Sequence, residues 1–495
     1  MHLLVAVDAG TTGVRALAVD LAGRVVDVSY RELTQSYPSP GLVEHDAREI
    51  LRLVDETLSE LARRLAGAGH SVAAIGITNQ RETVIAIDRE DGRILAPAIV
   101  WQDRRTAPVC ESMLADGHLA TVREATGLTL DPYFSATKMR WLLDNAALEG
   151  AGRLGLCTVD TLVCWHLTGG ADGGSFATDP SNASRTLLYD LDRATWSETL
   201  CALFGVPMRA LASIRPSCSV FGTVAAGHGD GLEGVAVAGI LGDQQAALFG
   251  QRCVRPGMVK ATFGTGAFLL ANTGPARAPH VDGLITSVAW DLGDFGPTSY
   301  VLEGSAFIAG AAIQWLRDEL ALIDSSSEVG ELAASVADAN GALFVPAFTG
   351  LGSPWWDPHA RGVLLGLSRG VTRAHVARAV VDALAFQGRA ILDAMRGGGI
   401  ELTELRVDGG AAAMDLLCQE LADSSRLTVR RPRSVEATAI GAATLAGVCV
   451  GATTLEDLDA SFEEEAAFRP RDPAVIDVTY ETWVDAVARS RSGPA

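Results

Sequence analysis

The sequence contains no CxxC pair, and its eight cysteines are scattered along the chain, at Cys110, Cys157, Cys164, Cys201, Cys218, Cys253, Cys418 and Cys449. Zinc knuckles and disulfide frameworks need cysteines at characteristic spacings. The pattern therefore predicts neither of these, and it favours a reducing, cytoplasmic location.

Long apolar segments and an excess of positive charge are also missing. No apolar run approaches the ~20 residues that span a bilayer, and Met1–Asp8 lacks both a basic segment and a cleavage site, so we expect neither export nor a membrane anchor. Lys and Arg number 40 against 60 Asp and Glu, a net charge of −20. Such a chain repels nucleic acid and anionic membranes, so a bound phosphate compound requires local donors and a metal ion.

What is present indicates a large α/β protein. The chain has 495 residues, of which 48% are hydrophobic, 20% are charged and 52 are glycine. This composition is typical of a packed enzyme, and the length exceeds what one hydrophobic core usually holds. We expect two domains, with a cleft between them as a natural place for chemistry.

The chain opens with a strand, a turn and a second strand. The apolar run Leu3–Val7 leads into the turn Gly10–Gly13, and Val14–Val19 resumes a strand. Such a turn can direct several backbone N–H groups and the hydroxyls of Thr11 and Thr12 at one point, which is what phosphate oxygens require.

Two charged residues border this turn. Asp8 precedes it and could hold Mg²⁺ directly or through water, and Arg15 follows it with a positive charge. The alternative is an ordinary hairpin turn with a capping aspartate. GxxxxGK[ST] is absent, and GxGxxG does not occur in a strand-to-helix setting, so the P-loop and Rossmann folds are excluded.

The same pattern returns in the second half of the chain. Met258–Thr262, the turn Phe263–Gly266 and Ala267–Leu270 again read as strand, turn and strand, which indicates an internal repeat and two homologous halves. Periodicity predicts the remaining elements, and we expect Ser490–Ala495 to fray. The predicted helices are Ala47–Ala66, Gln244–Phe249, Glu303–Leu320, Arg373–Met395 and Ala437–Val448, and the predicted strands are Val72–Thr78, Val84–Ile87, Val235–Leu241 and Leu405–Asp408.

One aspartate, one polar segment and one tryptophan are candidates for a functional site. Asp243 follows an apolar strand, where a general base is commonly placed, although an N-cap for the next helix is the alternative. The segment Thr78–Thr83 places Arg81 and Glu82 side by side, where they could bind the hydroxyls of a small triol or lie in a solvated loop. Trp101 is either a core residue or an apolar platform for a polyol.

These segments, in this order, closely resemble the FGGY carbohydrate kinases of the actin/hexokinase/Hsp70 ATPase superfamily, over nearly the whole chain. Two segments matching the family signatures lie at Tyr133–Asn145 and Gly362–Gln387. The most specific stretches are Gly76–Thr83 (GITNQRET), Ala98–Thr106 (AIVWQDRRT), Asp131–Lys138 (DPYFSATK), Gly242–Gly250 (GDQQAALFG) and Val345–Gly352 (VPAFTGLG).

The resemblance implies two actin-like (ribonuclease H-like) domains, each a mixed sheet flanked by helices, with a cleft that closes between them. Residues 1–250 would carry the polyol and the first phosphate loop, and residues 251–495 the second phosphate loop and the adenosine site. The implied reaction is transfer of a phosphoryl group from ATP to a polyol, with glycerol as the expected acceptor. Closure would exclude water, the competing acceptor.

The resemblance also implies the roles of individual residues. Asp243 would be the catalytic base, and Asp8 and Asp243 would flank Mg²⁺. The acceptor would contact Arg81, Glu82, Tyr133, Asp243 and Gln244, between apolar walls from Trp101 and Phe268. ATP would contact Thr11, Thr12, Gly13, Arg15, Thr265, Gly310, Gln314, Gly410 and Met414.

The chain departs from the family pattern at three places: Ala9 replaces a Gln, Gly13 replaces a Ser, and Met414-Asp415 stand where an Asn is expected near adenine. Gly13 still offers its backbone N–H, and Met414 can pack on adenine but offers no amide. The alternatives are a kinase for another polyol or sugar, such as a pentulose, gluconate or erythritol, a nucleotide-gated chaperone, and an inactive scaffold. A homodimer or homotetramer is expected from the resemblance.

Overall fold

The structure is a computed structural model that describes residues 1–146, 148, 151–471 and 474–491. The chain divides into two compact units. The first unit comprises residues 1–252, 286–300 and 436–462, and the second comprises residues 253–285, 301–435 and 463–495. In the described part of the chain, no helix combines the length and the apolar character needed to cross a membrane.

The first unit is built on a mixed sheet with the strand order β13-β14-β5-β1-β2-β3. Strand β1 pairs antiparallel with β2 and parallel with β5, and β5 pairs parallel with β14. The bounds are β1 (His2–Ala9), β2 (Gly13–Val19), β3 (Val25–Glu32), β5 (Ser71–Asn79), β13 (Val220–Thr223) and β14 (Ala236–Gly242).

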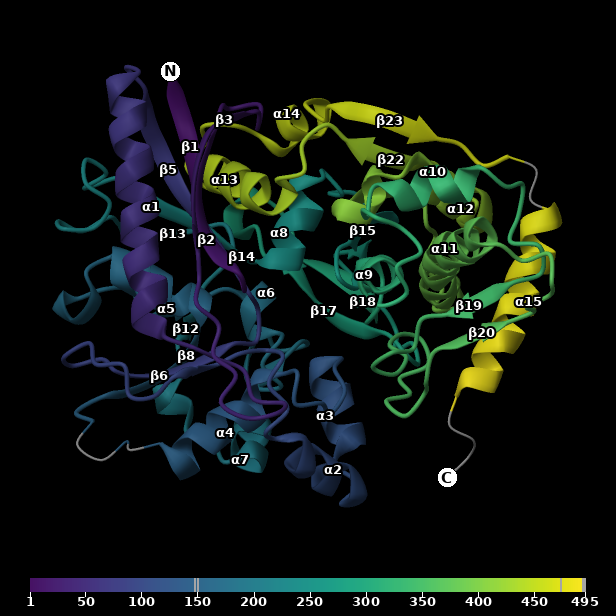
Figure 1. Cartoon of the computed structure of the whole chain (residues 1–495). Helices are drawn as coiled ribbons and strands as arrows, with labels where there is room; N and C mark the ends of the chain where they lie inside the picture. Colours follow the sequence, from purple (N-terminus) through teal and green to yellow (C-terminus); the bar gives the residue numbers. More distant parts are fainter. Residues whose placement is uncertain (147, 149–150, 472–473, 492–495) are drawn as a thin grey trace. The chain divides into compact units, whose positions relative to one another are not determined.

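Helices cover this sheet, which explains why its central strand is apolar without alternation. Leu3, Val5 and Val7 share a core with the apolar stripe of α1 (Ala47–Gly67). The other side of β1 meets α13 (Ala437–Cys449), where Leu4 lies against Gly447. Figure 1 shows α1 and α13 flanking the strands of this unit.

The rest of the first unit consists of short strands and helices. The strands are β4 (Glu44–His45), β6 (Val84–Asp88), β7 (Ala98–Ile99), β8 (Leu154–Thr158), β9 (Ala177–Thr178), β10 (Tyr189–Asp190), β11 (Thr195–Trp196) and β12 (Ser213–Ile214). The helices are α2 (Ala107–Ala115), α3 (Leu119–Thr126), α4 (Ser135–Asn145), α5 (Val159–Leu167), α6 (Pro180–Ala183), α7 (Glu198–Phe204), α8 (Asp243–Gly250) and α14 (Leu455–Ala460).

The second large sheet has the order β17-β18-β16-β15-β21-β22-β23. The strands, with the separate pair β19 and β20, are β15 (Met258–Phe263), β16 (Ala267–Gly274), β17 (Ile285–Trp290), β18 (Ser299–Ala306), β19 (Leu343–Val345), β20 (Val363–Leu365), β21 (Glu404–Asp408), β22 (Val429–Pro432) and β23 (Glu464–Phe468). The helices are α9 (Gly310–Asp318), α10 (Glu328–Ala334), α11 (Arg373–Gly397), α12 (Asp415–Ser425) and α15 (Ala474–Ser490).

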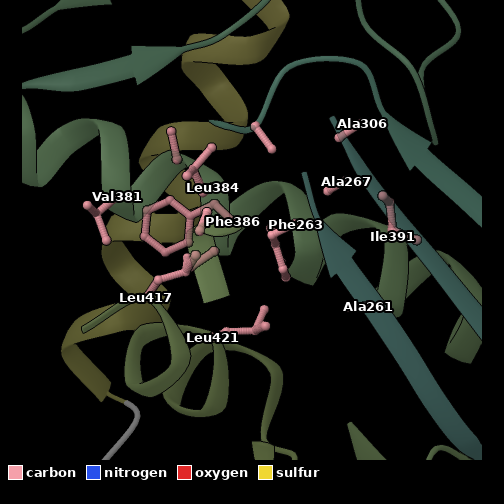
Figure 2. Packing of buried hydrophobic residues seen from close by; sticks show 14 of the residues in the cluster. Ala261, Phe263, Ala267, Ala306, Val381, Leu384, Phe386, Ile391, Leu417 and Leu421 are labelled. Carbon is pink, nitrogen blue, oxygen red and sulfur yellow. The ribbon is translucent and has the colours of Figure 1, made fainter. Parts of the chain in front are cut away.

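The core of the second unit forms between α11, α12 and the sheet. Phe386 of α11 is 2% exposed, and Phe263 at the end of β15 is 1% exposed. Figure 2 shows both rings together with Leu417 and Leu421 of α12. Burying one such aromatic side chain contributes about 1.5–3 kcal/mol, so this packing fixes the end of β15 and the turn that follows it.

The predicted internal repeat is confirmed at the level of topology. β1 and β2 form an antiparallel hairpin whose first strand pairs parallel with β5. β15 and β16 form an equivalent hairpin whose first strand pairs parallel with β21. The α/β class with two sheet-containing domains is also confirmed.

Most predicted elements match the observed ones within a few residues, but the helix predicted over Glu303–Leu320 is wrong in its first part. Residues Ser299–Ala306 form β18, and the helix begins only at Gly310. The segment is buried along almost its whole length in the sheet, and a short fully buried run cannot be distinguished from a buried helix by periodicity. Of the segment expected to fray, residues 492–495 lie outside the described residues.

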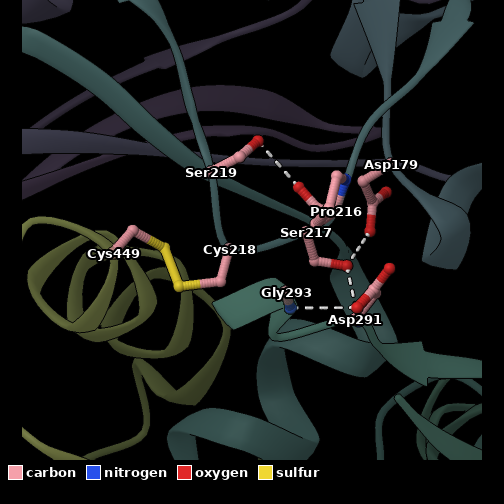
Figure 3. Close-up of a disulfide and its surroundings, with 8 residues drawn as sticks. All are labelled: Asp179, Pro216, Ser217, Cys218, Ser219, Asp291, Gly293 and Cys449. Atoms are coloured by element: carbon pink, nitrogen blue, oxygen red, sulfur yellow. Dashed lines mark hydrogen bonds between the residues drawn. A yellow bond between two sulfur atoms is a disulfide. The ribbon is translucent and has the colours of Figure 1, made fainter. Parts of the chain in front are cut away.

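The cysteine pattern gave no indication of disulfide bonds, and this prediction is wrong for one pair. Cys218, just before β13, and Cys449, at the end of α13, form a disulfide with their Cα atoms 5.1 Å apart (Figure 3). The two residues are 231 positions apart in sequence, so spacing along the chain gives no sign of the pairing. The other six cysteines are free and buried.

The two compact units do not correspond to a single division of the chain at residue 250, because each unit consists of three separate segments. Helix α13 belongs to the first unit because it packs on that sheet: a Cβ at Gly76 of β5 would lie 2.1 Å from the Ala442 carbonyl oxygen. Glycine at position 76 therefore permits the close approach of this helix. The assignment of function to residues 1–250 and 251–495 stays a prediction.

Candidate active site

Strand ends bring the candidate residues of the first unit together. Asp8 pairs in register with Thr78 on β5, and Thr78 pairs with Leu241 on β14. Because β1, β5 and β14 are parallel, their carboxyl ends meet at one edge of the sheet, which is where α/β sheets commonly bind ligands. The segments after these strands are Gly10–Gly13, Gln80–Thr83 and Asp243–Gly250.

The first turn is a compact loop. The Gly10 N–H donates to the Gly13 carbonyl oxygen (3.0 Å), and Thr12 is exposed at the tip. The Trp101 indole N–H donates to the Thr11 hydroxyl (2.9 Å). Trp101 is half-buried, so it is not a core residue, and it connects the turn to the polar segment Trp101–Arg105.

Gly13 has a steric role in this loop. A Cβ at position 13 would lie 2.4 Å from the Tyr30 hydroxyl and 2.5 Å from the Arg31 carbonyl oxygen of β3. A Cβ at Gly10 would be at least 3.4 Å from its neighbours. The Ser-to-Gly departure at position 13 thus coincides with a tyrosine that occupies the side-chain space.

We therefore expect Gly13→Ala to destabilise the loop by about 1–3 kcal/mol, because the added methyl group overpacks against the β3 backbone. Gly10→Ala in the same loop is the matched control and should change stability by much less. Urea unfolding of both variants measures the difference. Equal effects of the two substitutions would contradict this steric explanation.

Asp8 is a carboxylate in an unfavourable environment. Burial is the main cause that raises its pKa to about 7; Arg15 at 3.8 Å opposes this change, and the neighbouring charge of Asp243 adds to it. Arg15 also pairs with Glu436 at the start of α13. Glu436 was not anticipated from the sequence, and the charge of Arg15 is therefore partly compensated within the protein.

The raised pKa of Asp8 predicts a pH dependence of stability in metal-free buffer. Between its unfolded value of 3.8 and its folded value of about 7, the folded protein binds more protons, so stability decreases as pH rises through this interval. Relative to Asp8→Asn, the wild-type protein should lose about 2 kcal/mol between pH 5 and pH 8. Urea unfolding at both pH values tests this, and a constant difference between the two proteins would refute it.

The segment Gln80–Thr83 is buried, so the alternative of a solvated loop is wrong. Arg81 and Glu82 are each 2% exposed. Glu82 has a positive φ of 61°, a conformation that costs a non-glycine residue of order 1–3 kcal/mol and persists where the surroundings enforce it. The surrounding structure therefore holds the backbone of Glu82 in this conformation.

Arg81 is held by several side chains. Its Nε lies 3.1 Å from Asp243 Oδ1, its Nη1 donates to Gln245 Oε1 (3.3 Å), and its Nη2 donates to the Tyr133 hydroxyl (3.4 Å). A Cβ at Gly242 would lie 2.7 Å from Arg81 Cγ, so glycine is needed there for the arginine stem to pass. Arg81 thus orients the carboxylate proposed as the base.

Glu82 has a partner that sequence reasoning missed. Arg185 Nε donates to Glu82 Oε1 at 2.6 Å, and Arg185 is 0% exposed. Its guanidinium also lies 5.4 Å from the Tyr133 ring centre and 5.2 Å from that of Phe134. Arg185 is the one charged residue in the segment 183–188, whose other residues are small or apolar. That isolated charge is the sequence signal from which a buried partner could have been predicted.

Asp243 is the first residue of α8, whose N-cap is Gly242. The alternative in which Asp243 caps the helix is therefore wrong. Its Oδ1 accepts from the Gln244 N–H (2.7 Å), and its side chain is 31% exposed. Partial exposure leaves a carboxylate oxygen of Asp243 accessible to a bound hydroxyl. Gln244 is also partly exposed.

The structure brings five predicted residues of the second unit together around one cavity of about 730 Å³. They come from three segments: the turn after β15, the start of α9, and the connection from β21 to α12. They are Thr265, Gly310, Gln314, Gly410 and Met414. The volume is within the range of small-molecule sites. Phe268 lies elsewhere on this unit, half-buried on β16.

Close backbone contacts shape this cavity. The Gly310 N–H donates to the Gly264 carbonyl oxygen (2.8 Å), and a Cβ at Gly310 would lie 2.6 Å from that oxygen. Gly409 has φ of 90°, and a Cβ there would lie 2.5 Å from the Phe263 carbonyl oxygen. Ile313 and Leu416 add apolar lining, and Ser326 adds a hydroxyl. The lining therefore combines apolar side chains with a few polar groups, as is typical of small-molecule sites.

A sequence model of the FGGY family of carbohydrate kinases, N-terminal domain, matches residues 3–250, and one of the C-terminal domain matches residues 259–450. The chain belongs to the FGGY family of carbohydrate kinases. It is accordingly an ATP-dependent kinase that acts on an alcohol group, as the motifs predicted.

Similarity extends to particular relatives over almost the full length. A glycerol kinase of Bordetella parapertussis is 47% identical over 499 residues, covering 99% of this chain and 97% of the relative. One from Halorhodospira halophila is 49% identical over 498 residues, covering 98% and 96%. The crystal structure of Plasmodium falciparum glycerol kinase with ADP matches with a TM-score of 0.94 at 32% identity, covering 100% and 99%.

Proposed function

We propose that this protein transfers the γ-phosphoryl group of ATP to a terminal hydroxyl of glycerol, giving sn-glycerol 3-phosphate and ADP, the first step of glycerol breakdown. Relatives that share nearly half of its residues over the full length are glycerol kinases. The observation that carries the proposal is the buried pair Arg81 and Glu82 beside Asp243.

The acceptor site follows from these groups. Arg81, Glu82, Tyr133, Asp243 and Gln244 would bind the three hydroxyls of glycerol, with apolar walls from Trp101 and Phe268. An acceptor that lacks one of these hydroxyls would form fewer hydrogen bonds with these groups than glycerol does, which lowers its affinity relative to glycerol. The edge-on contact of Trp101 and Tyr133, with ring centres 5.6 Å apart, supports the wall beside the tyrosine hydroxyl.

The reaction requires a base and charge stabilisation. Asp243 would accept the proton of the attacking hydroxyl, and Arg81 at 3.1 Å would hold its carboxylate in position. The hydroxyl oxygen bonds to the γ-phosphorus as the bond to the ADP oxygen breaks, so ADP leaves in line with the attack. Thr11, Thr12, Gly13 and Arg15 would position the phosphates.

The cavity of the second unit would hold the nucleoside. Thr265 would contact phosphate from the second turn, and Gly310, Gln314, Gly410 and Met414 would surround the adenosine. The thioether of Met414 can pack against the adenine face. The cavity is large enough for this group, which supports the assignment.

Asp8 and Asp243 fit the requirements of Mg²⁺, which prefers carboxylate and water oxygens. Each raises the cost of the other's negative charge, and a divalent cation beside them would relieve that cost. When bound, Mg²⁺ neutralises charge on the phosphate oxygens. A cytoplasmic location, expected from the scattered cysteines, and a homodimer or homotetramer, expected from the family resemblance, remain part of the proposal.

Release of ADP in a coupled assay tests the proposal. The rate of ADP release by purified protein and Mg-ATP is measured in the presence of glycerol, xylulose, gluconate or erythritol, and without an added acceptor. Glycerol should stimulate ADP release far more than the other acceptors. Preferential stimulation by another polyol would move the substrate assignment, and no stimulation by any acceptor would remove the proposed activity.

A further inference from the structure

Three metal-binding side chains meet in the first unit at residues to which no part of the proposed reaction is assigned. Asp55 lies on α1, His166 near the end of α5, and His228 in the connection between β13 and β14. One ligand atom from each of them lies within 4.8 Å of the other two. Residues distant in sequence thus converge through three different elements.

The contacts among them are specific. Asp55 Oδ2 lies 2.8 Å from His166 Nε2, and Asp55 Oδ1 lies 3.3 Å from His228 Nδ1. The two imidazole rings are 4.2 Å apart at an angle of 68°. The side chains are 17–32% exposed, so the cluster is partly desolvated but still open to an ion from solution.

We propose that Asp55, His166 and His228 form a Zn²⁺ site, with a water molecule as the fourth ligand. Imidazole nitrogen and carboxylate oxygen bind Zn²⁺ at about 2.0–2.2 Å in tetrahedral geometry. Ligand atoms around such an ion are roughly 3.3 Å apart, close to the separations of 2.8 and 3.3 Å between the carboxylate oxygens and the ring nitrogens. The ion can therefore replace the two hydrogen bonds with little movement of the backbone.

The site would tie the β13–β14 connection to the two helices. The Asp230 N–H already donates to the Ser59 hydroxyl on α1 (3.1 Å), so this connection is anchored to α1 on both sides of Gly229. Zn²⁺ would add a stronger link to α5. Binding should therefore stabilise the folded protein, because the unfolded chain does not hold the three ligands together.

Titration with Zn²⁺ tests the site on full-length protein that has first been dialysed against a chelator. We expect about one Zn²⁺ per chain at this site by calorimetry and a higher melting temperature with the metal. His166→Gln and His228→Gln should each weaken this binding at least tenfold and abolish the thermal shift. Co²⁺ as a probe should give the visible absorption of a tetrahedral site in the wild-type protein only.

His280→Gln is the matched control, since His280 also contacts an aspartate, Asp282, at 2.9 Å but on an exposed surface. It should leave Zn²⁺ binding unchanged. Circular dichroism of each variant without metal checks that it is folded. The proposal is overturned if the wild-type protein gains no thermal stability from Zn²⁺, or if folded His166→Gln and His228→Gln retain wild-type binding. Either result would mean that the three side chains act only through hydrogen bonds.

Discussion

Replacing Asp243 with Asn should lower kcat by about 10²–10⁴-fold, the usual contribution of a general base. The asparagine oxygen can still accept from the Gln244 N–H and from Arg81, which contact Asp243 Oδ1. The site should therefore keep its shape, and glycerol binding should change little. Steady-state kinetics with glycerol and ATP give kcat, and calorimetry gives the affinity for glycerol.

Asp46→Asn is the control for this substitution. Asp46 is a true helix N-cap, and its side chain accepts from the Arg48 N–H at the start of α1. Asparagine caps helices about as well as aspartate, so this variant should keep the wild-type kcat. Near-normal turnover by Asp243→Asn would exclude Asp243 as the base. A large loss of kcat in Asp46→Asn would mean that kcat falls because the protein is destabilised and not because a base is missing.

Replacing Arg185 with Met should destabilise the protein by about 3–5 kcal/mol, because it leaves the Glu82 carboxylate buried without its nearest cation. The two groups are 2.6 Å apart and almost fully inaccessible. Urea unfolding measures the loss. Adding Glu82→Gln to this variant should recover part of the stability, since the uncompensated charge is then removed.

A surface arginine provides the comparison for Arg185. Arg52 forms ion pairs with Glu49 and Glu56 along α1, but its side chain is 54% exposed. Arg52→Met should leave the unfolding free energy nearly unchanged, because solvent screens such pairs. Equal losses in the two variants, or no recovery in the double variant, would contradict the account of the buried pair.

Features that depend on local pattern were predictable from the sequence. An apolar strand followed by a glycine turn identified both hairpins, and Asp243 was placed correctly after the strand β14, although the helix that follows begins one residue earlier than predicted. Arg81 and Glu82 stood out because two charged residues precede a buried strand. In each case the decisive information lies within about ten residues.

Features that depend on contacts between distant segments were not predictable in the same way. The partners Glu82 and Arg185 are 103 residues apart, Arg15 and Glu436 are 421 apart, and Cys218 and Cys449 are 231 apart. These pairs arise because the sheet topology and the return of α13 bring the segments together. The burial of β18 likewise depends on its neighbouring strands, and its sequence alone suggested a helix.

The most direct test follows the phosphoryl group itself. The protein is incubated with glycerol, Mg²⁺ and ATP whose terminal γ-phosphoryl oxygens carry ¹⁸O, and the products are measured by mass spectrometry. The account predicts sn-glycerol 3-phosphate that carries the labelled group, formed in equal amount to ADP. Label that appears only in inorganic phosphate, or ADP formed without glycerol phosphate, would contradict it.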